Sequence, residues 1–501
     1  MGETLEVFID FNSAQCFLCL PLLRTIVRDY DVKVKFLPHQ SSEKSYANVS
    51  EYNKRMKEYR RFDNRRYAKL LGWELIENSY SIKTRLALCG LLWANQKGWT
   101  ESFKYCEKAF KHAWMKEHGK VVPTFDAQTV EDLLLSCGLS IQGFDEFQRN
   151  VPDWRLLDGP YKSIVAVPCF RYNLDKILHN RYSIPFIRYY FHSKGMQRNS
   201  QVIPDITLAY RFPEPVISPN IFGMPGTGLN SKLKRYRERS HNQNYLRHNA
   251  KIIDVYIDIK SPHAYLAIEM SRALEEDFNV TVDFLPFDFN ITGVFGESVK
   301  ESVKNPGTME SANEHKIDEN NQRNPDQLKI VKSLYADCRY LANFQKTKIM
   351  GSLKVFDSTL ALIALLWAKK CGRKYLDLFL DAIYPLMWRR EMDIEDYKEL
   401  VMLMVSLGIP LKHDIYGSFS DFTSGRGRKE LIDIQVRAEK RGVLGVPSYL
   451  MEGEVYFGKE HLSLIRLKLE SEGLQIANPI VKNVVDVPYL WRPSFVEGSR
   501  L

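Results

Sequence analysis

The chain has 501 residues, of which 45% are hydrophobic and 26% charged, which suits about two to four globular domains and excludes a disordered or fibrous protein. Its formal charge of +9 is concentrated, because seven basic residues and one glutamate lie between residues 231 and 251. A nucleic-acid-binding protein usually carries its basic excess along a folded groove together with a recognisable reading element, and the sequence shows neither. We therefore expect no nucleic-acid partner.

The N-terminal residues 1–11 lack a basic region followed by an apolar stretch, and no long uninterrupted apolar run occurs. We expect neither a cleaved secretion signal nor a membrane segment. Eight cysteines in so long a chain do not form a dense disulfide framework, which favours a reducing compartment.

The sequence contains an internal repeat. A strand-like run ending in Ile-Asp, followed by a serine, occurs at 7–10 and again at 255–258. Further on, Phe-Leu-Pro occurs at 36–38 and 284–286, and Leu-Leu-Trp-Ala at 91–94 and 365–368. Matching segments in the same order predict a tandem duplication of one domain.

Each copy begins with a strand, a helix and a second strand. In the second copy the apolar periodicity predicts helices over Ser358–Lys370, Tyr375–Tyr384 and Asp393–Gly408. The turn Glu452-Gly453 predicts a hairpin, and a closing helix follows over Lys459–Leu469. This order predicts an α/β protein with two tandem thioredoxin-like domains, each with a helical insertion.

We place the domain boundaries from the repeat and from the linker composition. The first domain covers residues 1–195, and a Pro/Gly-rich and then basic linker covers 196–250. The second domain covers 251–478, and a C-terminal tail covers 479–501.

Ser261 is the candidate catalytic residue, because it stands where the first strand of the second copy meets a helix N-terminus. The positive end of a helix stabilises an anion, and a serine hydroxyl there can donate a hydrogen bond to a thiolate. The alternative is that Ser261 only caps the helix, with Pro262 at its first position.

Pro447 follows Val446 at the start of the hairpin. Its position after Ser261 and just before the hairpin predicts a cis proline, which leaves the preceding backbone available to an extended peptide ligand; the alternative is an ordinary edge-strand proline. Glu460 begins the closing helix, either beside a bound ligand or only as an acid favoured by the helix dipole.

Residues 251–473 resemble the DsbA-like thioredoxin group that includes kappa-class glutathione transferases and 2-hydroxychromene-2-carboxylate isomerases. The resemblance depends on Ser261-Pro262 within 257–266, on 442–447 and on Phe457-Gly458. It implies glutathione as co-substrate, with Ser261 activating the thiol and Val446 before Pro447 binding the cysteinyl backbone. It also implies contacts from Asn305 and from the position of Glu460, where Lys459-Glu460 replaces the family's serine and aspartate.

The first copy carries a degenerate version of this site, in which Ser13, Cys16 and Pro168 align with Ser261, Ala264 and Pro447. Cys16 and Cys19 form a C-x-x-C pattern, but the resemblance places the attacking cysteine at the position of Ser13. Buried apolar cysteines are the alternative to a redox pair.

No cysteine or histidine cluster has the spacing of metal ligands, so we expect no metal. His263 lies beside the predicted thiol site, and we expect it on the surface.

The resemblance predicts an enzyme, a glutathione-dependent transferase or isomerase that acts on a small electrophilic substrate. The alternatives are a thiol–disulfide oxidoreductase and a non-catalytic binding or scaffold protein. The first domain would be structural and replace the partner subunit of single-domain relatives, so that one chain holds both halves.

The chain ends in Ser499-Arg500-Leu501, which resembles the S-K-L peroxisomal address. This ending predicts a peroxisomal protein, with the cytosol or the mitochondrion as alternatives.

Overall fold

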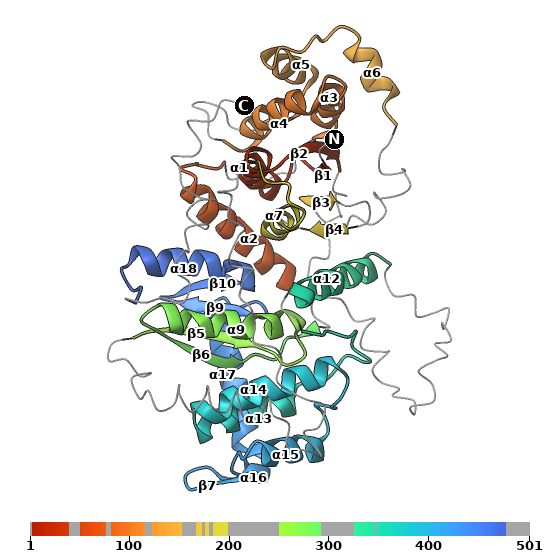
Figure 1. Ribbon diagram of the computed structural model, residues 1–501. Coiled ribbons are helices and arrows are strands. Elements are labelled where there is room, and N and C mark those ends of the chain that lie inside the picture. Colours follow the sequence, from red (N-terminus) through yellow and green to blue (C-terminus); the bar gives the residue numbers. More distant parts are fainter. Residues whose placement is uncertain are drawn as a thin grey trace, which may run out of the picture. The chain divides into compact units, whose positions relative to one another are not determined.

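The computed structural model describes residues 3–39, 51–76, 82–115, 123–152, 167–172, 176–179, 184–198, 250–291, 325–344 and 347–476 (Figure 1). The chain divides into two compact units. The described residues up to 198 belong to the first unit and those from 250 onward to the second.

The first unit is built on a four-stranded sheet of order β2-β1-β3-β4. The strands are β1 (Glu3–Ile9), β2 (Val32–Pro38), β3 (Cys169–Tyr172) and β4 (Lys176–His179). β1 and β2 run parallel, whereas β3 is antiparallel to both of its neighbours. The parallel pair requires a crossover, which α1 (Ala14–Asp29) supplies.

A helical insertion separates the two halves of this sheet. Its helices are α2 (Glu51–Leu70), α3 (Arg85–Asn95), α4 (Trp99–Trp114), α5 (Ala127–Ser136) and α6 (Phe144–Asn150), and α7 (Ile184–Ser193) follows the last strand. Hydrogen bonds from Asp31 N to Met196 O and from Arg198 N to Asp29 O tie the residues after α7 to the end of α1.

The second unit contains a sheet of the same topology, with the order β6-β5-β9-β10. Its strands are β5 (Lys251–Ile257), β6 (Val280–Pro286), β9 (Ser448–Met451) and β10 (Glu454–Phe457). β5 and β6 run parallel and are joined by α9 (Pro262–Asp277), and β9 is antiparallel to β5 and to β10. The predicted α/β class with two thioredoxin-like domains is confirmed, while the tandem duplication stays a prediction.

The predicted hairpin is present, because Met451 pairs with Glu454 across the turn. Glu452 and Gly453 have φ of 53° and 82°. Two successive positive φ values match the twist of the flanking strands, which favours this two-residue connection. A short 3₁₀ helix, η8 (Lys459–His461), and then α18 (Leu462–Ser471) close the unit.

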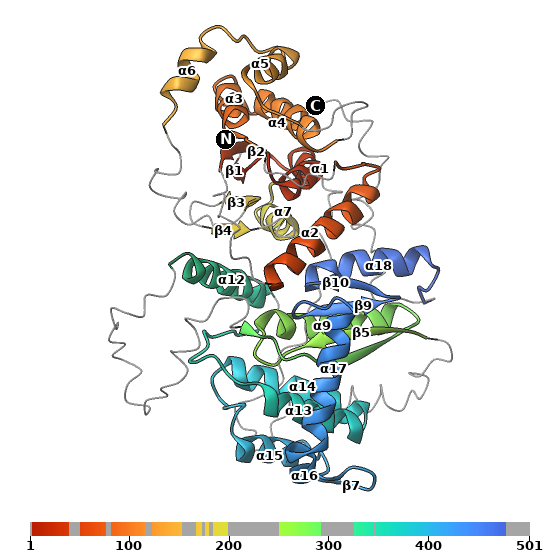
Figure 2. The same ribbon diagram turned by 180° about the vertical axis from the view of Figure 1, so that it is seen from behind.

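In the helical insertion of the second unit, most helices form a layer beyond the β6 edge of the sheet, whereas the first helix packs against α9 and α18 lies beside β10 (Figure 1, Figure 2). Its helices are α12 (Pro325–Phe344), α13 (Thr359–Cys371), α14 (Arg373–Trp388), α15 (Tyr397–Ser406), α16 (Phe419–Ser424) and α17 (Arg426–Lys440), with the small strands β7 (Lys412–His413) and β8 (Gly417–Ser418). Among the described helices, none has the length and apolar character needed to cross a membrane.

The helices predicted for this layer are present, but their first and last residues differ from the predicted ones. α13 is close to the predicted segment, and α14 is longer than predicted at both ends. α15 begins later than predicted because the Asp396 carboxylate accepts hydrogen bonds from Lys398 N and Glu399 N and so caps the helix.

Both units fix the first helix of the sheet with a buried ion pair to the closing helix. In the first unit Arg188 Nη2 lies 3.2 Å from Asp29 Oδ2, and in the second Arg466 donates to Asp277. All four side chains are buried. The two pairs therefore hold the C-terminal ends of α1 and α9 in corresponding positions.

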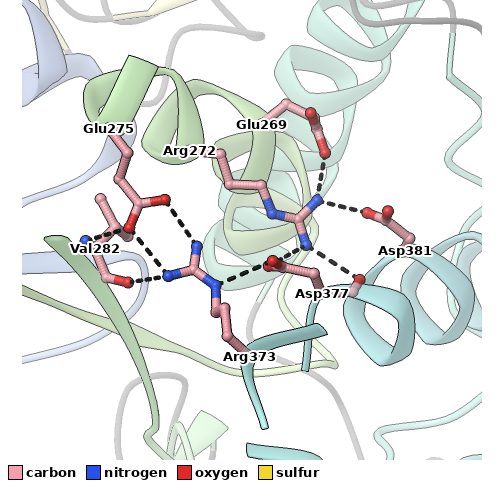
Figure 3. Close-up of polar contacts among 7 residues, drawn as sticks. All are labelled: Glu269, Arg272, Glu275, Val282, Arg373, Asp377 and Asp381. Atoms are coloured by element: carbon pink, nitrogen blue, oxygen red, sulfur yellow. Dashed lines mark hydrogen bonds and ion pairs between the residues drawn. The ribbon is translucent and has the colours of Figure 1, made fainter. Parts of the chain in front are cut away.

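A second network joins α9 to α14 (Figure 3). Buried Arg272 donates to Glu269 Oε1 and to Asp381 Oδ1, each at 2.6 Å, and also contacts Asp377. Arg373 donates to Glu275 and to the carbonyl of Val282 in β6. These contacts set the position of α9 against the insertion and against the sheet.

Replacing Arg466 by methionine should destabilise the second unit by about 3–5 kcal/mol, because the buried Asp277 carboxylate loses its ionic partner. Hydrogen exchange of the β5 amides measures this loss. The control is Lys354→Ala, whose pairs with Asp393 and Glu395 are solvent-exposed and are worth about 1 kcal/mol or less. Equal protection of β5 in both variants would contradict the assignment.

Candidate functional site

The candidate site begins at the turn between β5 and α9. Buried Asp258 accepts hydrogen bonds from Lys260 N at 3.1 Å and from Phe289 N at 2.8 Å, and its carbonyl accepts one from Ser261 N. The Lys260 ammonium lies 3.3 Å from the same carboxylate. Burial raises the pKa of Asp258, and the neighbouring Lys260 opposes this rise. The hydrogen bonds and the ion pair of Asp258 thus fix the turn on which Ser261 lies.

Ser261 is the N-cap of α9, because its Oγ accepts a hydrogen bond from Ala264 N at 3.2 Å and Pro262 occupies the first turn. The capping alternative is therefore correct as a description of the local structure. The hydroxyl keeps its capacity to donate a hydrogen bond, because within the described chain Ser261 Oγ donates to no acceptor. Ser261 is 9% exposed, so its hydroxyl lies in a largely buried place.

Pro447 lies at the same end of the sheet as Ser261. Tyr256 pairs with Ser448, which places the preceding Pro447 beside the carboxyl end of β5. The Val446–Pro447 peptide is cis, as the sequence predicted. Within the described chain no backbone hydrogen bond of the Val446 N–H or C=O is found.

Gly445 precedes this segment in a tightly packed place. A Cβ atom at Gly445 would lie 3.1 Å from the Phe289 ring and 3.1 Å from the Phe457 ring. A glycine is therefore the residue that lets the backbone approach these two aromatic side chains.

Glu460 lies at the start of η8, and its carboxylate folds back over Gly458, where a Cβ would lie 2.5 Å from Glu460 Oε2. Burial raises the pKa of Glu460, but Lys459, His263 and its own backbone N–H outweigh burial, so that the pKa is lowered. This placement matches the alternative of a first-turn acid, and a contact with a ligand stays a prediction. Asn305 lies outside the described residues.

Around His263, which lies two residues after Ser261, the structure groups five side chains that influence one another electrostatically, and we call them the polar cluster: His263, Asp337, Cys338, Lys459 and Glu460. His263 Nε2 lies 3.3 Å from Cys338 Sγ. Burial, with Lys459 second, lowers the pKa of His263 to about 4, and burial raises the pKa of the Cys338 thiol to about 12. The histidine and the thiol therefore face each other as neutral groups near pH 7.

His263 is half-buried against Cys338 and is not the surface residue that the sequence predicted. The physical reason is that α12 of the insertion packs against the first turn of α9. Asp337 and Cys338 were missed by the sequence analysis. No motif marks them, and their proximity to the site arises only when α12 is placed.

The corresponding site of the first unit is different in chemistry. Ser13 caps α1 and accepts from Cys16 N at 3.4 Å, and the Val167–Pro168 peptide is cis. Cys16 and Cys19 form no disulfide, and the Cys19 thiol donates to Cys16 O at 2.9 Å. Burial raises the pKa of Cys16 to about 12, which disfavours a reactive thiolate.

Aromatic packing also separates the two sites. In the first unit Phe17 stacks on Trp73 at 4.5 Å and on Phe110 at 5.9 Å between ring centres. In the second unit Tyr265 and Tyr384 stack at 5.2 Å, and their hydroxyls bond to Thr347 Oγ1 and to Asp258 O. The first unit is thus apolar where the second is polar. Within the described residues no group of three or more metal-ligating side chains is positioned to hold a metal ion.

This sheet order, with a helix N-terminus facing a cis proline, defines a thioredoxin-like domain with a helical insertion. Residues 252–470 match the family model of the DSBA-like thioredoxin domain. The matched residues lie within the second unit. A search of curated proteins finds no match.

Two solved structures are similar to the chain. A 2-hydroxychromene-2-carboxylate isomerase is 17% identical over 44% of this chain and 96% of its own, with a TM-score of 0.32. A probable DsbA oxidoreductase from Streptomyces coelicolor is 15% identical over 46% of this chain and 94% of its own, also with a TM-score of 0.32.

Cys16 and Cys19 should resist alkylation of the native protein at pH 8, because both are buried and Cys16 stays protonated there. The half-buried Cys137 and Cys371 should react first. Mass spectrometry of iodoacetamide-treated protein measures the order of modification. Rapid labelling of Cys16, or recovery of a Cys16–Cys19 disulfide, would instead support the redox alternative.

Proposed function

We propose that the second unit binds glutathione and that the Ser261 hydroxyl donates a hydrogen bond to its thiolate. The observation that carries the proposal is the unused Ser261 proton at the N-terminus of α9, at the sheet end where the cis Pro447 lies. A cysteine thiol has a pKa of about 8.5 in water, and lowering it by one unit requires about 1.4 kcal/mol of preferential stabilisation of the thiolate. A charge-assisted hydrogen bond is worth about 1.5–3 kcal/mol.

The remaining parts of the site would hold the tripeptide. The backbone N–H and C=O of Val446 would pair with the cysteinyl residue as a short strand addition. Lys459, which is 9% exposed, and Glu460 would face the charged end of the ligand, and Asn305 would contribute from outside the described residues. The thiolate would then attack a small electrophile, either to form a conjugate or to assist an isomerisation.

The first unit would serve a structural role in this scheme. Its support is the aromatic packing around Phe17 and the raised pKa of Cys16, both of which disfavour a thiolate at this place. The ending Ser499-Arg500-Leu501, which lies outside the described residues, supports a peroxisomal location by its resemblance to S-K-L.

Ser261→Ala should lower the rate of glutathione conjugation by about 10²-fold or more, because loss of one preorganised donor to a developing or resident anion has that order of effect. The thiolate ultraviolet absorbance of bound glutathione, followed against pH, should shift to higher pH. The matched control is Ser13→Ala, which removes the corresponding cap of the first unit and should leave both quantities unchanged.

Glutathione titration by calorimetry separates the proposal from its rivals. Binding of glutathione to the wild-type chain with unchanged conjugation in Ser261→Ala would reject the serine mechanism. Absence of any binding heat would reject the glutathione function and favour a binding or scaffold protein.

A further inference from the structure

Two arginine side chains from different elements of the second unit converge on one glycine. A Cβ atom at Gly351 would lie 3.4 Å from Arg339 Nη2 and 3.7 Å from Arg390 Nη2. Arg339 belongs to α12, whereas Arg390 follows the end of α14. Both residues are exposed. The protein therefore brings two positive charges to the same place on its surface, where they repel each other.

No carboxylate of the described chain neutralises these two charges. Neither arginine forms an ion pair with a described residue, although Asp337 and Glu391 are close to them in sequence. In the described chain their side chains make one hydrogen bond, from Arg390 Nε to Gly351 O at 2.8 Å. The arginines of Figure 3, by contrast, all contact carboxylates. The Nη groups of Arg339 and Arg390 are therefore donors that an anion from solution can use.

The backbone of Arg390 is strained. Its φ is 63°, and its N–H and that of Glu391 donate to the carbonyls of Met387 and Leu386. This motif usually ends a helix with a left-handed glycine, and α15 ends in the same way with Gly408 at the corresponding position. A side chain in the left-handed region lowers stability, and residues held in this way cluster at functional sites.

The chemistry of the pair indicates the kind of anion. A guanidinium group presents its N–H donors in a planar fork, and the bond to Gly351 O already fixes the fork of Arg390. One such fork matches a carboxylate. Two converging forks without a carboxylate partner match a group with two negative charges and three acceptor oxygens. A phosphate group has this charge and these oxygens near pH 7.

We propose that Arg339 and Arg390 form a binding site for a phosphate group, either free phosphate or the terminal phosphate of a small molecule. The fixed fork of Arg390 holds the group beside Gly351, and Arg339 adds the second charge from α12. A bound dianion removes the repulsion between the two arginines. The site uses none of the residues that we assign to glutathione, so it does not depend on the proposed function.

The test is a calorimetric titration of the full-length protein with inorganic phosphate and with phenyl phosphate at low ionic strength. Both should bind at one site, and acetate should bind more weakly. Arg339→Gln should weaken phosphate binding by about 10-fold or more, which is the order expected for loss of a charge-assisted hydrogen bond. The control is Lys398→Gln, which removes one exposed positive charge from α15 and should bind as the wild type does.

Arg390→Gly separates binding from stability. It replaces the strained left-handed residue by the one that this helix end usually carries, so the melting temperature should not fall. Phosphate binding should nevertheless weaken by about 10-fold or more, because the fixed fork is lost. The affinity of the wild type for phenyl phosphate should also rise as pH rises through about 6, where a phosphate monoester loses its second proton.

The source of the phosphate follows from the two probes. Tighter binding of phenyl phosphate than of inorganic phosphate identifies an esterified ligand, and equal binding identifies the free ion. Absence of binding to the wild type, or equal affinity in the wild type and Arg339→Gln, would overturn the proposal. Saturating glutathione should leave the phosphate affinity unchanged. Competition between the two ligands would make the arginines part of a glutathione site and would overturn the separate phosphate site.

Discussion

The site of the second unit depends on how firmly α9 is held. Its C-terminal end carries buried Asp277 paired with Arg466, and its middle carries buried Arg272 against Asp381. Charges removed from water are stable only when they are paired and hydrogen-bonded, so these contacts tolerate few positions of the helix. The N-terminus of α9, and with it Ser261, is placed by constraints that lie along the whole helix.

The two units have the same sheet order but bury different aromatic side chains beside their sites. Both units share the sheet order, a capping serine and a cis prolyl peptide, but Phe17 and Phe110 stack where Tyr265 and Tyr384 stack in the second unit. Phenylalanine needs no hydrogen-bond partner when buried, whereas each tyrosine hydroxyl requires one. The first unit can therefore close its site with apolar packing, and the second must surround its site with polar partners.

Burial shifts the pKa values of His263 and Cys338 in the polar cluster more than the neighbouring charges do. His263 and Cys338 are both held neutral near pH 7, while Glu460 stays ionised because Lys459 and a backbone N–H offset its burial. The low dielectric constant of a buried environment strengthens the electrostatic interactions of the groups that stay charged. In the proposed function, the Ser261 hydroxyl and the positive end of α9 would stabilise the bound thiolate.

The sequence by itself determined the features that are local. Strand alternation, the capping position of Ser261, the turn at Glu452-Gly453 and the proline at 447 each occupy a few neighbouring residues, so short-range backbone physics decides them. Only the tertiary structure placed Asp337 beside the η8 residues and Cys338 beside His263, because α12 lies far along the chain and no periodicity encodes which first turn it meets. The folded structure also places the Glu460 carboxylate against Gly458, which the composition of that segment left open.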